Sequence, residues 1–196
     1  MAANIGRRQP AGNAAGCCIL RQKSARLPLR RAGAGKRGSV EGMPKADYVT
    51  RNTPRLTLGG ARLMMAAAVR KAQSIGVPMD IAVVDDAGHL LVFNRMDGAK
   101  LSSIDIAVSK AWTAACSRRA THEYAEIAGP GRPAFGIHVS NNGRFMIVGG
   151  GLPVHVDGQI VGGIGCSSGT IQQDREVAMA GINVLASRTR RARRRS

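Results

Sequence analysis

Aromatic residues, acidic residues and long apolar runs are all scarce in this sequence. Only 3% of the 196 residues are aromatic, and 12 acidic residues stand against 29 Lys and Arg. No apolar run approaches the roughly 20 residues of a membrane-spanning helix, so we expect no membrane partner. Because 44% of the residues are nevertheless hydrophobic, the chain can bury the core of one domain.

The cysteines are few and form no recognisable ligand set. Cys17 and Cys18 are adjacent near the N-terminus, whereas Cys116 and Cys166 are isolated. The absence of a CxxC pair excludes the usual zinc spacing, and the absence of CxxCH excludes covalent haem attachment. Isolated cysteines in a core are typical of a reducing compartment, so we expect a cytoplasmic protein.

The net charge of +17 is concentrated at the two ends of the chain. Residues 1–55 carry about +10 and residues 188–196 carry +6, whereas residues 56–187 are almost neutral at +1. We therefore predict a disordered basic arm over 1–55, a folded domain over 56–187 and a disordered Arg-rich tail over 188–196. Met43 is a candidate natural start, and a transit peptide is the alternative interpretation of the arm. Because the domain itself is almost neutral, we expect no specific nucleic-acid partner.

Apolar runs around tight turns predict two β-hairpins. Asp157-Gly158 lies between two such runs and is a strong signal for a two-residue turn, while Asp86-Ala87-Gly88 turns the other pair. With one further apolar run before the triple glycine, the predicted strands span 79–85, 89–96, 145–148, 152–156 and 159–167. Strands joined by hairpins form antiparallel sheets, so the predicted fold class is α+β rather than doubly wound.

Apolar residues at helical spacing predict about three main helices packed against this sheet. The first is capped by Thr57 and the last by Thr170, which has the spacing of a capping box. The second begins at Ser102 or Ser103, and a short helical turn follows over 121–127.

Charged side chains within the domain are assigned to turns, caps and solvent. Asp favours turn and cap positions because its carboxylate bonds to nearby backbone amides. This accounts for Asp85, Asp86, Asp97 and Asp105. Lys110, on the second helix, is interpreted as a solvated residue. The sequence has no GxSxG motif and no visible nucleophile and base, so no catalytic residue is assigned.

Three short motifs, together with the second hairpin and the helix start after it (152–174), resemble one protein family. The motifs are VVDDAGHL at 83–90, RMDGA at 95–99 and GGGLP at 149–153. In this order they are similar to the GlcG/HbpS family of small bacterial proteins, which is associated with haem binding, and the resemblance covers about 56–185. It implies a profilin-like antiparallel sheet with helices packed against it, and a homo-oligomer.

The resemblance implies a small-ligand-binding or accessory protein that holds haem, another tetrapyrrole or a small anionic metabolite noncovalently. The alternative is a small enzyme of hydroxy-acid or carboxylate metabolism, with an anion site at a helix N-terminus. Whether the protein has any catalytic activity stays open, because the resemblance does not imply one particular reaction.

Two loops and one arginine are the candidate ligand-binding elements. Glycines permit close approach of the backbone, and hydroxyls with free amides before a helix suit an anion. The candidates are Arg95, Gly149, Gly150, Gly151, Ser167, Ser168, Gly169 and Thr170. The alternatives are a bent strand connection, an ordinary capped helix and a structural pair between Arg95 and Asp97.

A noncovalently bound haem needs an axial donor, an apolar slot and cations for its propionates. His89 lies within a family motif and is the first candidate ligand, and Cys166 is the second, with a small buried hydrophobe as its alternative role. The expected lining of the slot is Met64, Met65, Ile164 and the glycines of 162–165. The expected cations are Arg95, Arg118 and Arg119.

Overall fold

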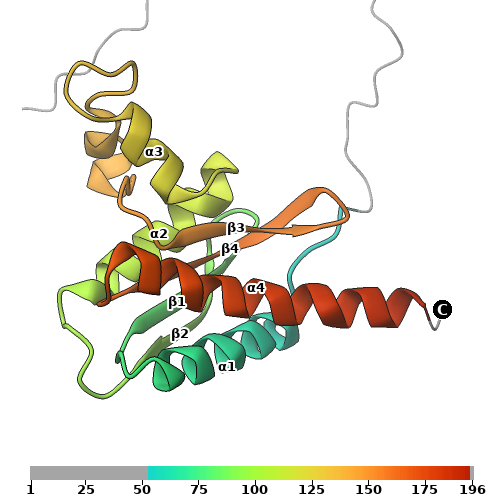
Figure 1. The fold of residues 1–196 in the computed structure, drawn as a ribbon. Helices are drawn as coiled ribbons and strands as arrows, with labels where there is room; N and C mark the ends of the chain where they lie inside the picture. Colours follow the sequence, from blue (N-terminus) through green and yellow to red (C-terminus); the bar gives the residue numbers. More distant parts are fainter. Residues whose placement is uncertain (1–52, 195–196) are drawn as a thin grey trace, which may run out of the picture. The chain divides into compact units, whose positions relative to one another are not determined.

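The fold is built on one antiparallel sheet with helices on both of its faces (Figure 1). The computed structural model describes residues 53–194. The strands lie in the order β2-β1-β4-β3 across the sheet, with bounds β1 Asp80–Asp85, β2 Leu90–Arg95, β3 Gly151–Val156 and β4 Gln159–Ser167. Each strand is antiparallel to its neighbours, which confirms the predicted α+β class and the profilin-like arrangement.

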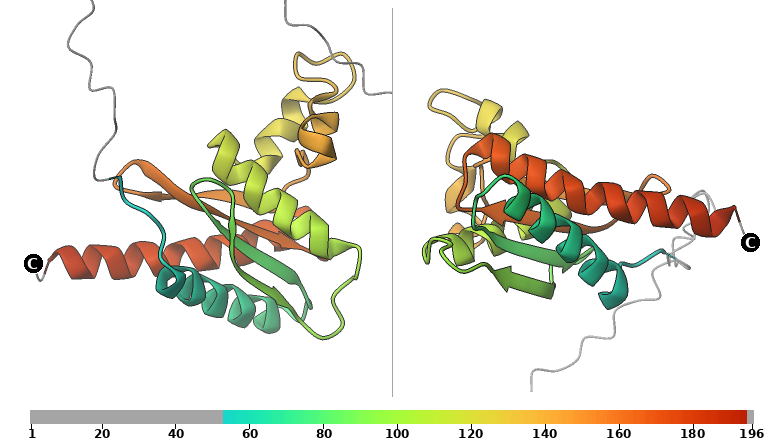
Figure 2. Two further views of the ribbon diagram at one scale, coloured as in Figure 1. Left: turned by 180° about the vertical axis from the view of Figure 1, so that it is seen from behind. Right: turned by 60° about the horizontal axis from the view of Figure 1, so that its bottom comes forward.

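The described α-helices have the bounds α1 Leu58–Ser74, α2 Ser103–Ser117, α3 Thr121–Ile127 and α4 Ile171–Arg193, with short 3₁₀ turns at Ile137–Val139 and Asn141–Gly143. Of these helices, α1, α2 and α4 cover the faces of the sheet, and α3 contacts α2 and the edge strand β3. Helices α1 and α4 pack together on one face, and α2 covers the other, as the views in Figure 2 show. No helix in residues 53–194 has the length and apolar character needed to cross a membrane.

The predicted starts of α1 and α4 are confirmed by individual hydrogen bonds. Thr57 Oγ1 accepts from the amide of Gly60 at 3.1 Å. At α4 the capping box is complete, because Thr170 Oγ1 accepts from the Gln173 amide at 3.3 Å and Gln173 Oε1 accepts from the Thr170 amide at 2.9 Å. These two helix ends are therefore determined by residues only three positions apart.

The backbone of α2 lies directly against β4. A Cβ atom at Gly163 would overlap the carbonyl oxygen of Ala111, and one at Gly165 would overlap that of Ala107. The side chains of α2 that face the sheet are alanines, which keeps the two backbones close. The predicted tetrapyrrole slot beside 162–165 is therefore wrong, because α2 occupies that space.

The opposite face of the sheet carries the main core, packed under α1 and α4. Met64 and Ile164 are fully buried in this core, and Met65 is nearly so. A Cβ atom at Gly181 of α4 would lie only 2.8 Å from the Ile164 side chain, so the packing leaves no spare volume there. The three residues expected to line an apolar slot instead fill a closed core.

Residues 145–148 do not form the predicted strand. Thr113 Oγ1, on α2, accepts from the amide of Met146 at 2.9 Å and donates to the Arg144 carbonyl at 3.4 Å. The ring of Phe145 packs edge-on against Tyr124, with their centroids 4.8 Å apart. The segment therefore packs against α2 and α3. Its backbone hydrogen bonds are made with the Thr113 side chain rather than with a neighbouring strand.

Helix α4 continues past the predicted boundary of the folded domain. It runs to Arg193, whereas residues 188–196 were expected to be a disordered tail. Arg and Ala are strong helix formers, and cations near a helix C-terminus interact favourably with the helix dipole, so this sequence extends the helix. Residues 1–52 and 195–196 lie outside the described chain, so the basic arm over 1–55 stays a prediction.

Substitution of a β4 glycine by alanine tests the contact between α2 and β4. We expect Gly165→Ala to lower the free energy of unfolding by about 3 kcal/mol or more, because the new methyl group meets backbone rather than a movable side chain. The new methyl group of Gly59→Ala, in the first turn of α1, meets only Thr57 Oγ1 at 3.7 Å, an ordinary contact, so this variant should gain up to about 1 kcal/mol. Urea unfolding of both variants measures the difference, and equal stabilities would contradict the described packing.

Candidate functional site

A lysine and an aspartate form a buried ion pair where α2, α4 and the loop before β3 meet. Lys110 Nζ lies 2.8 Å from Asp174 Oδ2 and also donates to the carbonyl of Cys166 at 3.0 Å. Lys110 is 1% exposed and Asp174 is 3% exposed. The interpretation of Lys110 as a solvated residue is therefore wrong. Its neighbours on α2 are buried alanines, so the helix directs the lysine inward, where only a carboxylate makes its charge tolerable.

The two glycine-containing loops predicted to bind a ligand do meet, and they meet around this ion pair. Asp174 Oδ1 accepts from the Gly169 amide at 3.0 Å, and the Gly150 carbonyl accepts from the Cys166 amide at 3.0 Å. A Cβ atom at Gly150 would come within 2.9 Å of Lys110 Nζ. The space between the loops is thus taken by the chain's own lysine, and the glycines serve that internal contact.

The amides at the start of α4 are likewise engaged by the chain itself. The Gly169 amide bonds to Asp174 and the Thr170 amide bonds to Gln173, so neither is free for an external anion. Among the other candidates in this loop, Ser167 is buried and Ser168 is half-buried. This geometry favours the ordinary capped helix over the anion site.

Removing one partner of the buried pair is expected to be costly. Lys110→Met leaves the Asp174 carboxylate buried without a cation, which should lower the free energy of unfolding by about 3–5 kcal/mol. Arg119→Met is the control, because the Arg119–Glu123 pair is exposed and should cost less than about 1 kcal/mol. Urea unfolding compares the two variants. Similar costs would show that Lys110 does not bear a buried charge.

A second carboxylate, Asp80 at the start of β1, is fully buried. Its Oδ2 accepts from Ser168 Oγ at 3.3 Å, while Oδ1 has no hydrogen-bond partner among the described residues. The strand register pairs Asp80 with Arg95 on β2 and with Ser167 on β4. Three predicted site residues therefore gather around a carboxylate that sequence reasoning missed.

Burial raises the pKa of Asp80, and the Ser168 hydrogen bond and the charge of Arg95 oppose this only in part. A raised carboxyl pKa in the folded state means that ionised Asp80 destabilises the fold above that pKa. The penalty begins to fall as the pH drops through the raised pKa, and it disappears below the pKa that the carboxyl group has in the unfolded chain. The charge of the exposed Arg95 thus acts on Asp80, whereas sequence reasoning had offered Asp97 as its structural partner.

The sign of this pKa shift gives a pH-dependent prediction. Asp80→Asn should raise the melting temperature at pH 7, because it removes a poorly solvated charge, and the advantage should vanish in acid, where the wild-type carboxyl is neutral. Asp85→Asn is the matched control. Asp85 accepts from the Ala87 and His89 amides at 3.0 and 2.8 Å, so its loss should destabilise the turn. A lower melting temperature for Asp80→Asn at pH 7 would contradict the assigned shift.

The two predicted haem ligands lie in unlike surroundings. The His89 side chain is 81% exposed and its Nδ1 lies 3.5 Å from Asp85 Oδ2. Cys166 is fully buried in the core, where a porphyrin iron cannot reach its sulfur, and burial also raises the pKa of its thiol far above the ordinary value. The position of Cys166 favours its alternative role as a small core hydrophobe.

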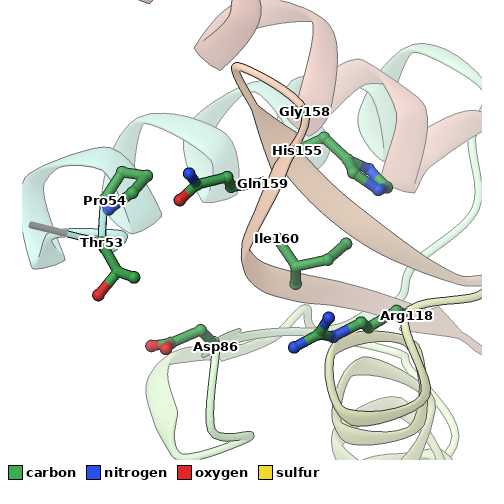
Figure 3. A pocket seen from close by; sticks show the side chains of 8 residues that line it. All are labelled: Thr53, Pro54, Asp86, Arg118, His155, Gly158, Gln159 and Ile160. Atoms are coloured by element: carbon green, nitrogen blue, oxygen red, sulfur yellow. The ribbon is translucent and has the colours of Figure 1, made fainter. Parts of the chain in front are cut away.

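A cavity of about 450 Å³ lies beside the turns of both hairpins and the end of α2. Its lining is Thr53, Pro54, Asp86, Arg118, His155, Gly158, Gln159 and Ile160. Figure 3 shows the Arg118 guanidinium pointing into the space between Ile160 and Asp86. The volume is in the range of small-molecule sites, and the lining combines an imidazole, a guanidinium, the carboxylate of Asp86, which pairs with Arg55, the amide of Gln159 and apolar surface.

Arg118 has an unusual backbone at this cavity. It is the C-cap of α2 and adopts a left-handed conformation with φ 58°, which non-glycine residues rarely use. Its neighbour Arg119 instead pairs with Glu123 on α3, with 3.1 Å between Nε and Oε2, and contributes nothing to the cavity. Sequence reasoning named Arg118 as a cation but had no signal that would bring it to His155, because the two lie in different elements.

The fold and the cavity define a small profilin-like α+β domain whose interior is filled and whose ligand-sized space lies at one end of the sheet. A family model described as "Haem degrading protein HbpS-like" matches residues 56–183. The chain belongs to this family.

Similar proteins include two curated relatives and one solved complex. The 15.0 kDa protein in the dhaT-dhaS intergenic region of Citrobacter freundii is 41% identical over 131 residues, 67% of this chain and 92% of that protein. GlcG of Escherichia coli is 42% identical over 107 residues, 55% of this chain and 77% of GlcG. The crystal structure of a PduOC:haem complex has a TM-score of 0.65 and 34% identity, and covers 67% of this chain and 95% of that one.

Proposed function

We propose that this protein binds haem or a closely related tetrapyrrole noncovalently in the cavity beside Arg118. The observation that carries the proposal is the meeting of His155, Arg118 and Ile160 at one space of about 450 Å³. Support comes from the family description, which names haem, and from the similar PduOC domain, which was crystallised with haem.

The lining residues fit the chemical needs of a haem. His155 is exposed on β3, so its imidazole is available as an axial donor. Ile160 and Pro54 give apolar contact for the macrocycle, and the Arg118 guanidinium suits a propionate carboxylate. When bound, the iron porphyrin supplies the redox and ligand chemistry, while these residues hold and orient it.

The alternative, an enzyme acting on small hydroxy acids, has less support. It requires free amides at the start of α4, and those of Gly169 and Thr170 are already bonded to Asp174 and Gln173. The proposal is therefore a binding or accessory role.

The proposal also includes self-association, because β2 and β3 are the edge strands of the sheet and an edge strand can pair with another copy.

Haemin titration of the full chain in a Cys17→Ser/Cys18→Ser background tests the proposal. The double substitution removes two thiols that ligate iron by themselves. We expect a saturable Soret shift at about one haem per chain. His155→Ala should weaken binding by at least about tenfold, and Arg118→Gln by about 3- to 10-fold, the loss of one charge-assisted hydrogen bond.

Two matched controls distinguish the cavity from general attraction. His89→Ala removes another exposed imidazole, which lies outside the cavity, and Arg119→Gln removes the cation adjacent to Arg118. Both should leave the affinity within about twofold of the parent. A Soret shift that depends on His89 and not on His155 would overturn the assignment of the cavity. The absence of any saturable Soret shift would overturn the proposed function.

A further inference from the structure

The end of α4 leaves the domain as an exposed, arginine-rich helix. Leu185 is the last buried residue of α4, and no described residue after it is buried. Figures 1 and 2 show this end of α4 extending past the sheet. From Leu185 to Arg193 the helix rises about 12 Å at 1.5 Å per residue. Packing against the domain therefore does not account for this helical extension.

Four arginines of this extension have no charge partner among the described residues. None of the exposed Arg188, Arg190, Arg191 and Arg194 forms an ion pair with another described residue. The last acidic residue of the sequence is Glu176, which pairs with Lys71 of α1. Helix-dipole stabilisation explains a cation or two in the last turn and does not require a longer series.

The spacing of the arginines directs several of them to one side. Positions 187, 190, 191 and 194 lie three and four residues apart, so they share a helix face, and the residues there line one hollow of about 420 Å³. Ser187 lies at the N-terminal end of this face, and Arg190, Arg191 and Arg194 make up the rest of it. Guanidinium groups arranged in this way match the phosphate groups of a polyanion, each of which accepts two parallel hydrogen bonds.

The lack of large apolar and aromatic residues in this extension indicates which kind of polyanion it can bind. Between Ala186 and Arg194 the only apolar side chains are alanines, whereas a membrane-surface helix needs large apolar residues opposite its cations. The same stretch has no aromatic residue, and single-stranded nucleic acid is held largely by aromatic stacking. The remaining partner is the regular phosphate backbone of a duplex, whose major groove admits a helix.

We propose that the end of α4, residues 186–194, binds the phosphate backbone of duplex nucleic acid without base specificity. This surface is separate from the haem cavity and does not depend on the haem proposal. It also revises the inference from charge distribution, because part of the basic excess belongs to an ordered helix face rather than to a disordered tail.

The test measures binding of the full chain to two labelled 20-base-pair duplexes of unrelated sequence by fluorescence anisotropy between 50 and 200 mM salt. Both duplexes should bind equally. Replacing Arg188, Arg190, Arg191 and Arg194 by Gln should reduce the slope of log K against log salt by about 3 to 4, because each lost phosphate contact contributes about 0.9. The melting temperature should stay unchanged, since the core contacts end at Leu185.

Two control variants separate the helix face from total charge. Replacing the same four arginines by Lys keeps the charge and should keep most of the slope. Replacing Arg7, Arg8, Arg30 and Arg31 by Gln removes the same charge from the N-terminal arm and should change the slope much less. An unchanged slope in the α4 Gln variant, or an equal loss in the arm variant, would overturn the proposal. Binding to phosphatidylserine vesicles instead of duplexes would assign the face to membranes and overturn it too.

Discussion

The direct contact between the backbones of α2 and β4 is the constraint on which the rest of the structure depends. Gly163 and Gly165 make the contact possible, and it brings Lys110 on α2 into the interior. A buried ammonium group requires an anion, which Asp174 supplies from the first turn of α4. The ion pair therefore connects the position of α2 to that of α4 and to the loops that enclose them.

A filled interior confines ligand binding to the surface of the domain. The glycines that looked like space for a ligand are positions where the chain contacts itself, around Lys110 and under α2. The cavity lies instead at the C-terminal end of α2, where Arg118 leaves the helix in a left-handed conformation. The same helix thus holds the ion pair at one point and presents a cation to the cavity at its end.

Features that depend on neighbouring residues were predictable from the sequence, and features that depend on distant ones were not. The caps at Thr57 and Thr170 and the turn at Asp157-Gly158 follow from local chemistry. Lys110 and Asp174 are 64 positions apart, so nothing beside either residue indicates the pair. His155 and Arg118 lie in different elements and line one cavity because the fold brings β3 to the end of α2. The arginines from residue 188 resembled a disordered tail because their charge was given more weight than the helix propensity of Arg and Ala.

Haem binding in the cavity beside Arg118 can be seen in a crystal structure of the haemin-saturated protein. We expect electron density for the porphyrin against Ile160, an imidazole nitrogen of His155 on the iron, and a propionate within hydrogen-bonding distance of Arg118. Density for haem at His89, with the cavity lined only by protein and water, would contradict it.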